Sequence, residues 1–452
     1  MRLSTIPYQN VVGSSYRFDP SYHLSEANKV RSMLQSLPYG ITTVASASDR
    51  VFTGNIFSRV FVKDAVHGVP YLAASDTVLS DLETGFFISK KQASELSYLT
   101  LQKDWILVTC SGTLGNVTYT NKVFENRLAT HDLIRIVPND KEILRGCLYA
   151  FLSSKYGYYQ LTQSSFGGVV KHINADHAKA IRVPLFQEAF QKEVDKLIKD
   201  SAQLREDANA SISRARQMID ECFEKVCTIM SHRVSIKDIQ SSHNTRFEGF
   251  YYTSENRALY DYITKNLDYK PLDEYVQRIF RPGIFKREYV SNGVKFLGGA
   301  DIMRAIPDSD KQLSFRQVES MPELTVKKGW ILVTCGGTIG NTVVIDNQLE
   351  QCAISQHVMR IVPKDDIKKG FLYAFLSSQV GFKLITLFSA GSVIPQIENH
   401  HLGMIPVPSL DTDRVNAIED LVSDYIAKIE ASKAKEIEAI GAVEHEIERW
   451  NN

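Results

Sequence analysis

The sequence lacks the features that would place the chain in a membrane or in an oxidising compartment. Its 452 residues contain no run of eighteen apolar residues, which argues against a membrane-spanning helix. Residues 1–7 lack the apolar core of a secretory signal. Six cysteines are spread thinly and form no Cys-x-x-Cys pair, so neither a zinc framework nor a redox dithiol is indicated. We expect a cytoplasmic protein with buried free thiols and no membrane contact.

The chain also lacks a net charge, because 52 Lys and Arg balance 52 Asp and Glu. The charged residues are unevenly distributed along the chain. Residues 186–235 hold eight basic and nine acidic residues, net −1, and residues 409–452 hold five and eleven, net −6, so the rest of the neutral chain carries +7. Basic domains suit a phosphate backbone, although a charge of this size also fits an ordinary surface. The charge pattern is therefore compatible with nucleic acid but does not require it.

The strongest positive feature is an internal repeat with an offset of about 225 residues. The run Trp105–Cys110 recurs as Trp330–Cys335, and the Gly-Thr-x-Gly-Asn sequence that follows it recurs as well. Further matches pair Arg135–Pro138 with Arg360–Pro363, Leu148–Ser154 with Leu372–Ser378, Arg17-Phe18 with Arg246-Phe247, and Ile56-Phe57-x-Arg59 with Ile284-Phe285-x-Arg287. A period of this length is too long for a solenoid and indicates two copies of a whole domain.

Each copy, in residues 1–186 and 236–408, predicts a mixed α+β domain dominated by strands. Short β-rich runs such as Leu133–Val137 are bounded by Gly, Asn, Asp and Pro. Short helical stretches such as Gly146–Tyr159 interrupt these runs.

The segments that follow the copies, residues 187–235 and 409–452, predict long helices. In the first, apolar residues recur in steps of three and four from Val194 to Cys222, with Ser201 and Ser211 on the same seam. A similar stripe runs from Val415 to Trp450. Because such a stripe must be buried on helices of roughly 60 Å, we expect two antiparallel coiled-coil helices that separate the domains. The alternative is that each helix packs only on its own domain.

These features together resemble the specificity (S) subunit of Type I restriction–modification enzymes. The resemblance covers nearly the whole chain. Its most specific elements are Gly329–Asn341, Ala390–Ile397 and Ile405–Pro408, the last at the start of a long helix. In the first copy Phe166–Ile173 takes the place of the second element, with Lys171 where Pro395 stands, so the match is looser there.

The resemblance implies a division of labour. One S subunit joins two methyltransferase (M) subunits for adenine-N6 methylation, and two restriction (R) subunits complete an ATP-dependent nuclease that cleaves unmodified DNA. Each domain would be a target-recognition domain that reads half of a bipartite site in double-stranded DNA, while the helices set the gap and dock the M subunits. This chain would bind no cofactor, since S-adenosylmethionine and ATP would lie on partner subunits. A Type IIB enzyme or another methylation-based phage-defence system, and a protein-binding adaptor that never touches DNA, are the alternatives.

The Gly-Thr-x-Gly-Asn loops could suggest a phosphate cradle. A P-loop needs Lys and then Ser or Thr after its last Gly, whereas Asn116 and Asn341 stand there. We therefore expect the glycines to permit a tight exit from a strand, with contact between loop amides and DNA phosphates as the alternative. Neither an Asn-Pro-Pro-aromatic nor a Phe-x-Gly-x-Gly motif occurs, so a non-catalytic chain is expected.

Candidate DNA-binding residues are basic and amide side chains in segments where the copies differ. Arg can donate two hydrogen bonds to guanine and Gln to adenine, while Lys more often contacts phosphate. His131 corresponds to Gln356 and His172 to Gln396, which argues against a catalytic histidine and fits side chains that read different bases. For each residue alone, an ordinary surface or structural role is the alternative. The candidates are Arg50, Arg59, Lys63, Lys90, Lys91, Lys171 and His172 in the first copy, and Arg278, Arg281, Lys286, Arg287, Lys295, Arg304 and Gln396 in the second.

Overall fold

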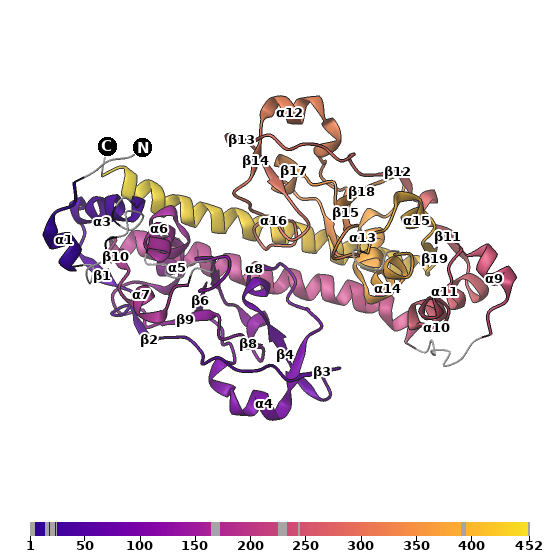
Figure 1. Cartoon of the computed structure of the whole chain (residues 1–452), viewed down its shortest axis with the longest axis horizontal. Coiled ribbons are helices and arrows are strands. Elements are labelled where there is room, and N and C mark those ends of the chain that lie inside the picture. The colour runs from indigo at the N-terminus through magenta and orange to yellow at the C-terminus, as the bar shows by residue number, and fades with distance from the viewer. Residues whose placement is uncertain are drawn as a thin grey trace. The chain divides into compact units, whose positions relative to one another are not determined.

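The computed structural model describes residues 5–13, 18, 23, 25–163, 172–224, 233–242, 245–389 and 395–450. The contacts divide the chain into two units, one made of residues 1–206 and 431–452 and the other of residues 207–430. Each unit holds one copy of the repeat together with part of each long helix (Figure 1).

The first unit is built on a four-stranded antiparallel sheet in the order β2-β9-β6-β7. Its alternate residues face two different cores. Ile106 and Val108 lie in a core with helical residues such as Leu148, whereas Leu107 lies in a second core with Leu72 and Phe124. Both faces are covered, which explains why the strand reads as a continuous apolar run. The strands are β2 (Ser48–Phe52), β9 (Leu133–Pro138), β6 (Ile106–Thr109) and β7 (Val117–Tyr119).

A smaller sheet in the order β3-β5-β4-β8 lies beyond the second core, and β1 pairs with β10 at another edge of the unit. The strands are β3 (Phe61–Val62), β5 (Phe87–Ser89), β4 (Gly68–Leu72), β8 (Leu128–Ala129), β1 (Ile41–Thr43) and β10 (Arg182–Pro184). The helices are α1 (Tyr8–Gly13), α3 (Glu26–Ser36), α4 (Lys90–Glu95), α5 (Arg145–Ser153), α6 (Lys155–Gln163) and α7 (Ala175–Lys179).

The second unit repeats this architecture, with a four-stranded sheet in the order β12-β18-β15-β16. The register repeats too, because the irregularity between Ser48 and Arg50 on β2 recurs between Val276 and Arg278 on β12. The predicted duplication of a mixed, strand-rich domain is thus confirmed. The strands are β11 (Tyr269–Pro271), β12 (Val276–Phe280), β13 (Tyr289–Leu297), β14 (Gln312–Leu313), β15 (Ile331–Thr334), β16 (Thr342–Val344), β17 (Ala353–Ile354), β18 (Val358–Pro363) and β19 (Pro406–Pro408).

The helices of the second unit cover its sheet in the same way as those of the first. Its core joins Ile331 and Ile361 of the sheet to a helical pair that includes Phe375 and Leu384. The helices are α9 (Ile236–Ser241), α10 (Gly249–Thr253), α11 (Glu255–Asn266), α12 (Phe315–Ser320), α13 (Lys369–Ser377), α14 (Gln379–Leu387) and α15 (Asn399–Gly403).

Each four-stranded sheet encloses a fully buried arginine, Arg135 on β9 and Arg360 on β18. Neither forms an ion pair with a carboxylate of the described residues. Their guanidinium groups donate instead to backbone carbonyls: Arg135 to those of Leu99, Ala129, Thr130 and Leu133, and Arg360 to those of Leu324, Ile354, Ser355 and Val358. Burial lowers the pKa of each to about 10, so both stay charged at neutral pH. The two arginines hold together the loops that enter these strands.

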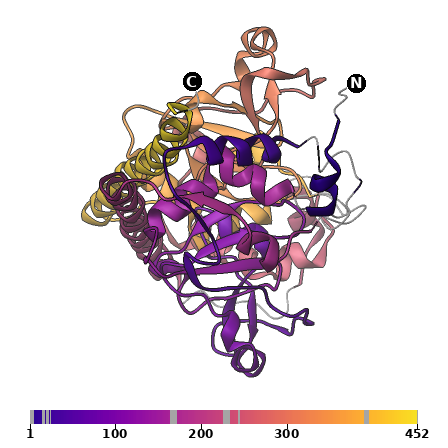
Figure 2. The same cartoon turned by 90° about the vertical axis from the view of Figure 1, so that its left-hand side faces the viewer.

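The two long helices are α8 (Glu188–Asp220) and α16 (Thr412–Glu448). They lie side by side, and Figure 2 shows them nearly end-on. In the second unit Ser211 donates to Asp424 at 2.6 Å and Arg414 to Cys222 at 2.6 Å, so the helices run antiparallel. The predicted antiparallel pair is therefore confirmed. The first helix ends at Asp220, earlier than the predicted segment of 187–235, and a single 3₁₀ turn follows it.

The helical seam differs in detail from the predicted one. Ser201 lies on it, as predicted, and exchanges hydrogen bonds of 2.9 Å with Ser432 of α16 in the first unit. The apolar residues Val194, Ala208 and Ala215 of the predicted stripe are buried, whereas Leu197, Leu204 and Met218 are only half-buried. Ile198, Ile212 and Ile219, which the stripe did not include, are buried as well. On α16, Ile437 is exposed, and so is Trp450 beyond its end.

Among the described residues, no single helix is long and apolar enough to cross a membrane. Helices α13 and α14 reach that length only together, with a bend of 70° between them.

Replacing Gly381 by alanine is expected to destabilise the second unit. A Cβ atom there would lie 2.0 Å from the carbonyl oxygen of Phe375, where α13 turns into α14. We expect a loss of about 3 kcal/mol in the free energy of unfolding, measured by urea titration. Gly441→Ala is the matched control: nothing lies within 4 Å of its Cβ position, so this helical site should gain about 0.5–1 kcal/mol. Equal stabilities of the two variants would contradict the packing argument.

Candidate nucleic-acid interface

A similar loop leaves the first strand of each large sheet, residues 53–60 after β2 and residues 281–288 after β12. A glutamine holds each loop at two points. Gln92 donates to the carbonyl of Ser58 at 2.6 Å and accepts from the amide of Val60 at 2.9 Å. Gln317 makes the same pair with Lys286 at 2.7 Å and Glu288 at 3.0 Å. The loops are therefore pre-organised, and we call them the clamped loops.

Each clamped loop carries an arginine over an aromatic ring. The guanidinium of Arg59 lies 5.7 Å from the ring centre of Tyr71 and donates to the Tyr71 hydroxyl at 2.6 Å. It also donates to Thr130 at 3.2 Å and lies 3.9 Å from Asp132.

In the second unit Arg287 lies 5.5 Å from the ring centre of Phe296. It donates to the side-chain oxygen of Gln356 at 3.3 Å. Scaffold and arginine are the same in the two units, while the polar groups beside the arginine differ. This is the arrangement expected where two copies recognise different chemical patterns.

A second arginine–aromatic stack lies on the first strand of each large sheet. Arg50 lies 4.4 Å from the ring centre of Phe52, and that ring meets Trp105 edge-on at 6.0 Å. Arg278 lies 4.1 Å from Phe280, which meets Trp330 at 6.0 Å. Arg50 and Arg278 are exposed, and Arg278 also pairs with Glu323 at 3.2 Å. Both predicted positions thus present a cation that an aromatic ring supports.

The remaining predicted residues fall into different settings. One nitrogen of Arg281 donates to both carboxylate oxygens of Glu398, at 2.8 and 2.9 Å, and Lys295 pairs with Asp308. Arg304 is half-buried and has polar interactions of its own. The four exposed lysines are Lys63, Lys90, Lys91 and Lys286. Lys171 lies outside the described residues, as do most of the segments 166–173 and 390–397 that carry the family resemblance.

His172 and Gln396 occupy equivalent places at the ends of these segments. His172 bridges Ser111, and Gln396 bridges Gly336, each through the backbone. Both bridges join the segment to the Gly-Thr-x-Gly-Asn loop of the same unit. The side chain of Gln396 is exposed and that of His172 half-buried.

The Gly-Thr-x-Gly-Asn loops are tight turns closed on a threonine. The amides of Gly115 and Asn116 donate to Thr109, and those of Gly340 and Asn341 to Thr334, all at 3.0 Å. All four loop glycines have positive φ, between 68° and 93°. The predicted tight strand exit is confirmed. Because these amides are engaged within the loop, they offer no cradle to a phosphate group.

Charged contacts attach each sheet to a long helix of the same unit. Lys103 pairs with Glu206 of α8 at 3.1 Å, which also accepts from the amide of Lys122 at 2.8 Å. Lys328 and Asn347 contact Glu430 of α16 in the same way, at 2.7 and 3.1 Å.

The N-terminus of a sheet-covering helix adds a second attachment. The amide of Gly146 donates to Asp195 at 2.8 Å, and that of Phe371 donates to Glu419 at 2.9 Å. A carboxylate is favoured at this end of a helix. Each strand-rich domain is thus fixed to its own stretch of helix.

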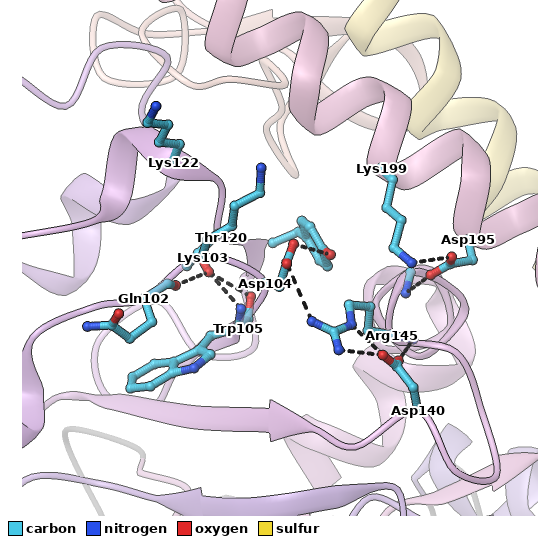
Figure 3. A network of polar contacts seen from close by, with 12 residues as sticks. Gln102, Lys103, Asp104, Trp105, Thr120, Lys122, Asp140, Arg145, Asp195 and Lys199 are labelled. Atoms are coloured by element: carbon cyan, nitrogen blue, oxygen red, sulfur yellow. Dashed lines mark hydrogen bonds and ion pairs between the residues drawn. The ribbon is translucent and has the colours of Figure 1, made fainter.

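A half-buried polar network lies beside this attachment in the first unit (Figure 3). Asp104, in the left-handed region at φ 66°, accepts from Tyr119 at 2.8 Å and lies 3.4 Å from Arg145, which also pairs with Asp140. Burial, reinforced by Asp104, raises the pKa of the Tyr119 hydroxyl far above its ordinary value, so it remains a donor. Gly329 stands in the place of Asp104 in the second unit and takes the same left-handed conformation.

Metal-ligating and nucleophilic side chains were compared among the described residues. No group of three or more His, Cys, Asp or Glu among them could hold a metal ion. Burial raises the pKa of the Cys110 thiol to about 11, which keeps it protonated and unreactive.

The aromatic half of these sites was not predicted from the sequence. Phe52 and Phe280, and likewise Tyr71 and Phe296, occupy matching positions in the two copies, yet only basic and amide side chains were selected. An alignment of the copies that included aromatic positions would have found them, since an exposed arginine is often held by a ring.

A family model described as the Type I restriction modification DNA specificity domain matches residues 51–210 and 286–440. No curated protein sequence matches the chain.

Similar solved structures include the S subunit of a Type I restriction–modification system from M. genitalium, at 15% identity and a TM-score of 0.36, covering 92% of this chain and 96% of that one. The HsdS subunit from Thermoanaerobacter tengcongensis matches at 13% identity and a TM-score of 0.29, covering 91% and 97%. A structure titled for complex assembly and conformational transition of the type I R-M system matches at 12% identity and 0.29, covering 92% and 97%.

Proposed function

Because the chain belongs to the Type I restriction modification DNA specificity domain family, we propose that it is the subunit that selects the DNA target of a Type I restriction–modification complex. Each unit would read one half of a bipartite site in double-stranded DNA. The chain itself would perform no chemistry. Methylation of adenine and cleavage of unmodified DNA would be carried out by M and R subunits that hold S-adenosylmethionine and ATP.

One observation carries this proposal: the two units share a scaffold but differ in the polar groups beside a shared arginine. Arg59 lies with Thr130 and Asp132, and Arg287 lies with Gln356. Sequence is read through side chains that donate to and accept from base edges, so two readers of different half-sites need a common frame with different polar residues. A catalytic pair would instead require the same reacting groups in both copies.

The paired helices are the proposed docking surface for the M subunits. Residues 409–452 carry a net charge of −6, from five basic and eleven acidic residues, which does not suit a DNA phosphate backbone. Acidic, exposed helical faces suit a protein partner with basic residues. The same helices would set the distance between the two half-sites.

The basic test is a titration of duplex DNA with this chain co-expressed with an M subunit. Sequencing of methylated adenines in the host, with and without the gene, supplies the motif. We expect tighter binding to duplexes with the motif and an affinity that falls steeply with salt, since phosphate contacts release counterions. An affinity that ignores both salt and motif would leave a protein-binding adaptor as the better description.

A lengthened helical pair is expected to change the gap in the target but not its half-sites. The unit boundary falls after Glu206 on α8 and after Glu430 on α16, so seven residues inserted at both points add about 10 Å to the pair. The gap should grow by up to about three base pairs. Both points avoid Glu436, whose side chain contacts Tyr149 and Arg205. Methylated-adenine sequencing that shows altered half-sites and an unchanged gap would contradict the proposal.

A further inference from the structure

The two most exposed large hydrophobic side chains of the described residues stand at matching positions of the repeat. Ile56 is 87% exposed and Ile284 is 95% exposed. Both lie in the clamped loops, three residues before Arg59 and Arg287. A single exposed isoleucine needs no explanation. The same exposure at the same place in two copies that differ elsewhere points to a shared use.

The structure holds these side chains outward. The next residue in each loop is a phenylalanine that points inward: Phe57 packs with Tyr71 and Ile88, and Phe285 meets Phe296 edge-on at 6.2 Å. Gln92 and Gln317 fix the backbone two to four residues further on. The isoleucines are therefore presented by an anchored turn.

The surroundings favour nucleic acid over an apolar protein surface. Arg59 lies in the same loop as Ile56, and its guanidinium is 5.7 Å from the ring centre of Tyr71. Lys286 and Arg287 lie two and three residues after Ile284, and Lys286 is exposed. An exposed isoleucine beside guanidinium groups suits a DNA groove, because phosphates line the edges of the groove and mainly polar base edges lie between them.

We propose that Ile56 and Ile284 each contact the C5-methyl group of a thymine in the half-site read by their own unit. The inference rests on the proposed function. The thymine methyl is the apolar group that base edges present in the major groove, and an aliphatic side chain is its natural partner. A half-site that contains a methylatable adenine contains an A·T pair and therefore a thymine. The two isoleucines thus add an apolar reading element to the arginines beside them.

The test uses the complex of the full chain with its M subunit, measured by fluorescence anisotropy on duplexes with and without the methylated motif. Ile284→Ala should weaken binding to the motif about five- to tenfold, the effect of losing one or two buried methylene-sized contacts, and leave binding to other DNA unchanged. Ile56→Ala should do the same through the other half-site. The matched control is Ile236→Ala, on a side chain that is 74% exposed at the start of α9 and should bind as the unchanged chain does.

Replacing the thymines of the motif by deoxyuridine, one at a time, identifies the contact. In each half-site, deoxyuridine at one position should weaken DNA binding by the unchanged complex by the same factor. The same replacement should not weaken binding further in the alanine variant of the isoleucine that reads that half-site. Motif binding by Ile56→Ala and Ile284→Ala within twofold of the unchanged complex would overturn the proposal. If either variant no longer assembled with the M subunit in size-exclusion chromatography, the proposal would be overturned too, because the isoleucine would then contact protein. Failure of the proposed function is distinguishable, since the unchanged complex itself would then ignore the motif.

Discussion

Replacing Arg135 by methionine is expected to destabilise the first unit by about 3–5 kcal/mol, the largest effect of any single change proposed for this chain. The side chain is fully buried and donates to the carbonyls of Leu99, Ala129, Thr130 and Leu133. Methionine fills a similar volume but leaves these oxygens without donors inside a covered sheet. Scanning calorimetry should show the first unit melting roughly 10 °C lower.

Two companion variants separate this cause from a general loss of packing. Arg360→Met should lower the stability of the second unit in the same way, because that side chain makes the equivalent contacts. Arg50→Met, on an exposed side chain of the neighbouring strand β2, should change stability by no more than about 0.5 kcal/mol. If the first unit had the same melting temperature in Arg135→Met and in Arg50→Met, the carbonyl contacts would contribute nothing to stability.

Replacing Arg287 by alanine is expected to reduce affinity for the DNA motif by about 10- to 100-fold and to relax one half-site only, the range found for a two-pronged arginine–base contact. Arg59→Ala should relax the other half-site. A guanidinium has five N–H groups, and the contacts of Arg287 within the described residues engage one of its nitrogens, through Gln356. The arginine is therefore pre-positioned to donate further to a base.

Methylated-adenine sequencing of hosts that carry each variant gives the readout, because relaxed reading appears as extra bases tolerated in one half of the motif. Lys265→Ala serves as the control, since this exposed lysine on α11 pairs with Asp261 of the same helix. Should both arginine variants weaken motif and non-motif DNA alike, the two side chains would be phosphate contacts and the reading groups would lie elsewhere.

The two arginine pairs show how tertiary contacts divide residues that look alike in sequence. Arg50 and Arg135 lie on neighbouring strands, β2 and β9, yet the first is exposed over Phe52 and the second is fully buried. Arg281 and Arg287 look equally suited to DNA in the sequence, yet Arg281 pairs with both oxygens of Glu398, which lies 117 residues further along the chain. Spacing along one segment carries no information about such partners.

What the sequence determined by itself is the plan of the molecule: two copies of a strand-rich domain, each followed by a long helix, and tight turns at the Gly-Thr-x-Gly-Asn loops. These features are local or periodic, so residue order alone expresses them. Only the tertiary structure decided which arginines present a cation and which hold the fold, which helical positions are buried, and that Ile56 and Ile284 point outward. Those properties depend on burial and on partners far away along the chain, and they exist only once the strands and helices have packed.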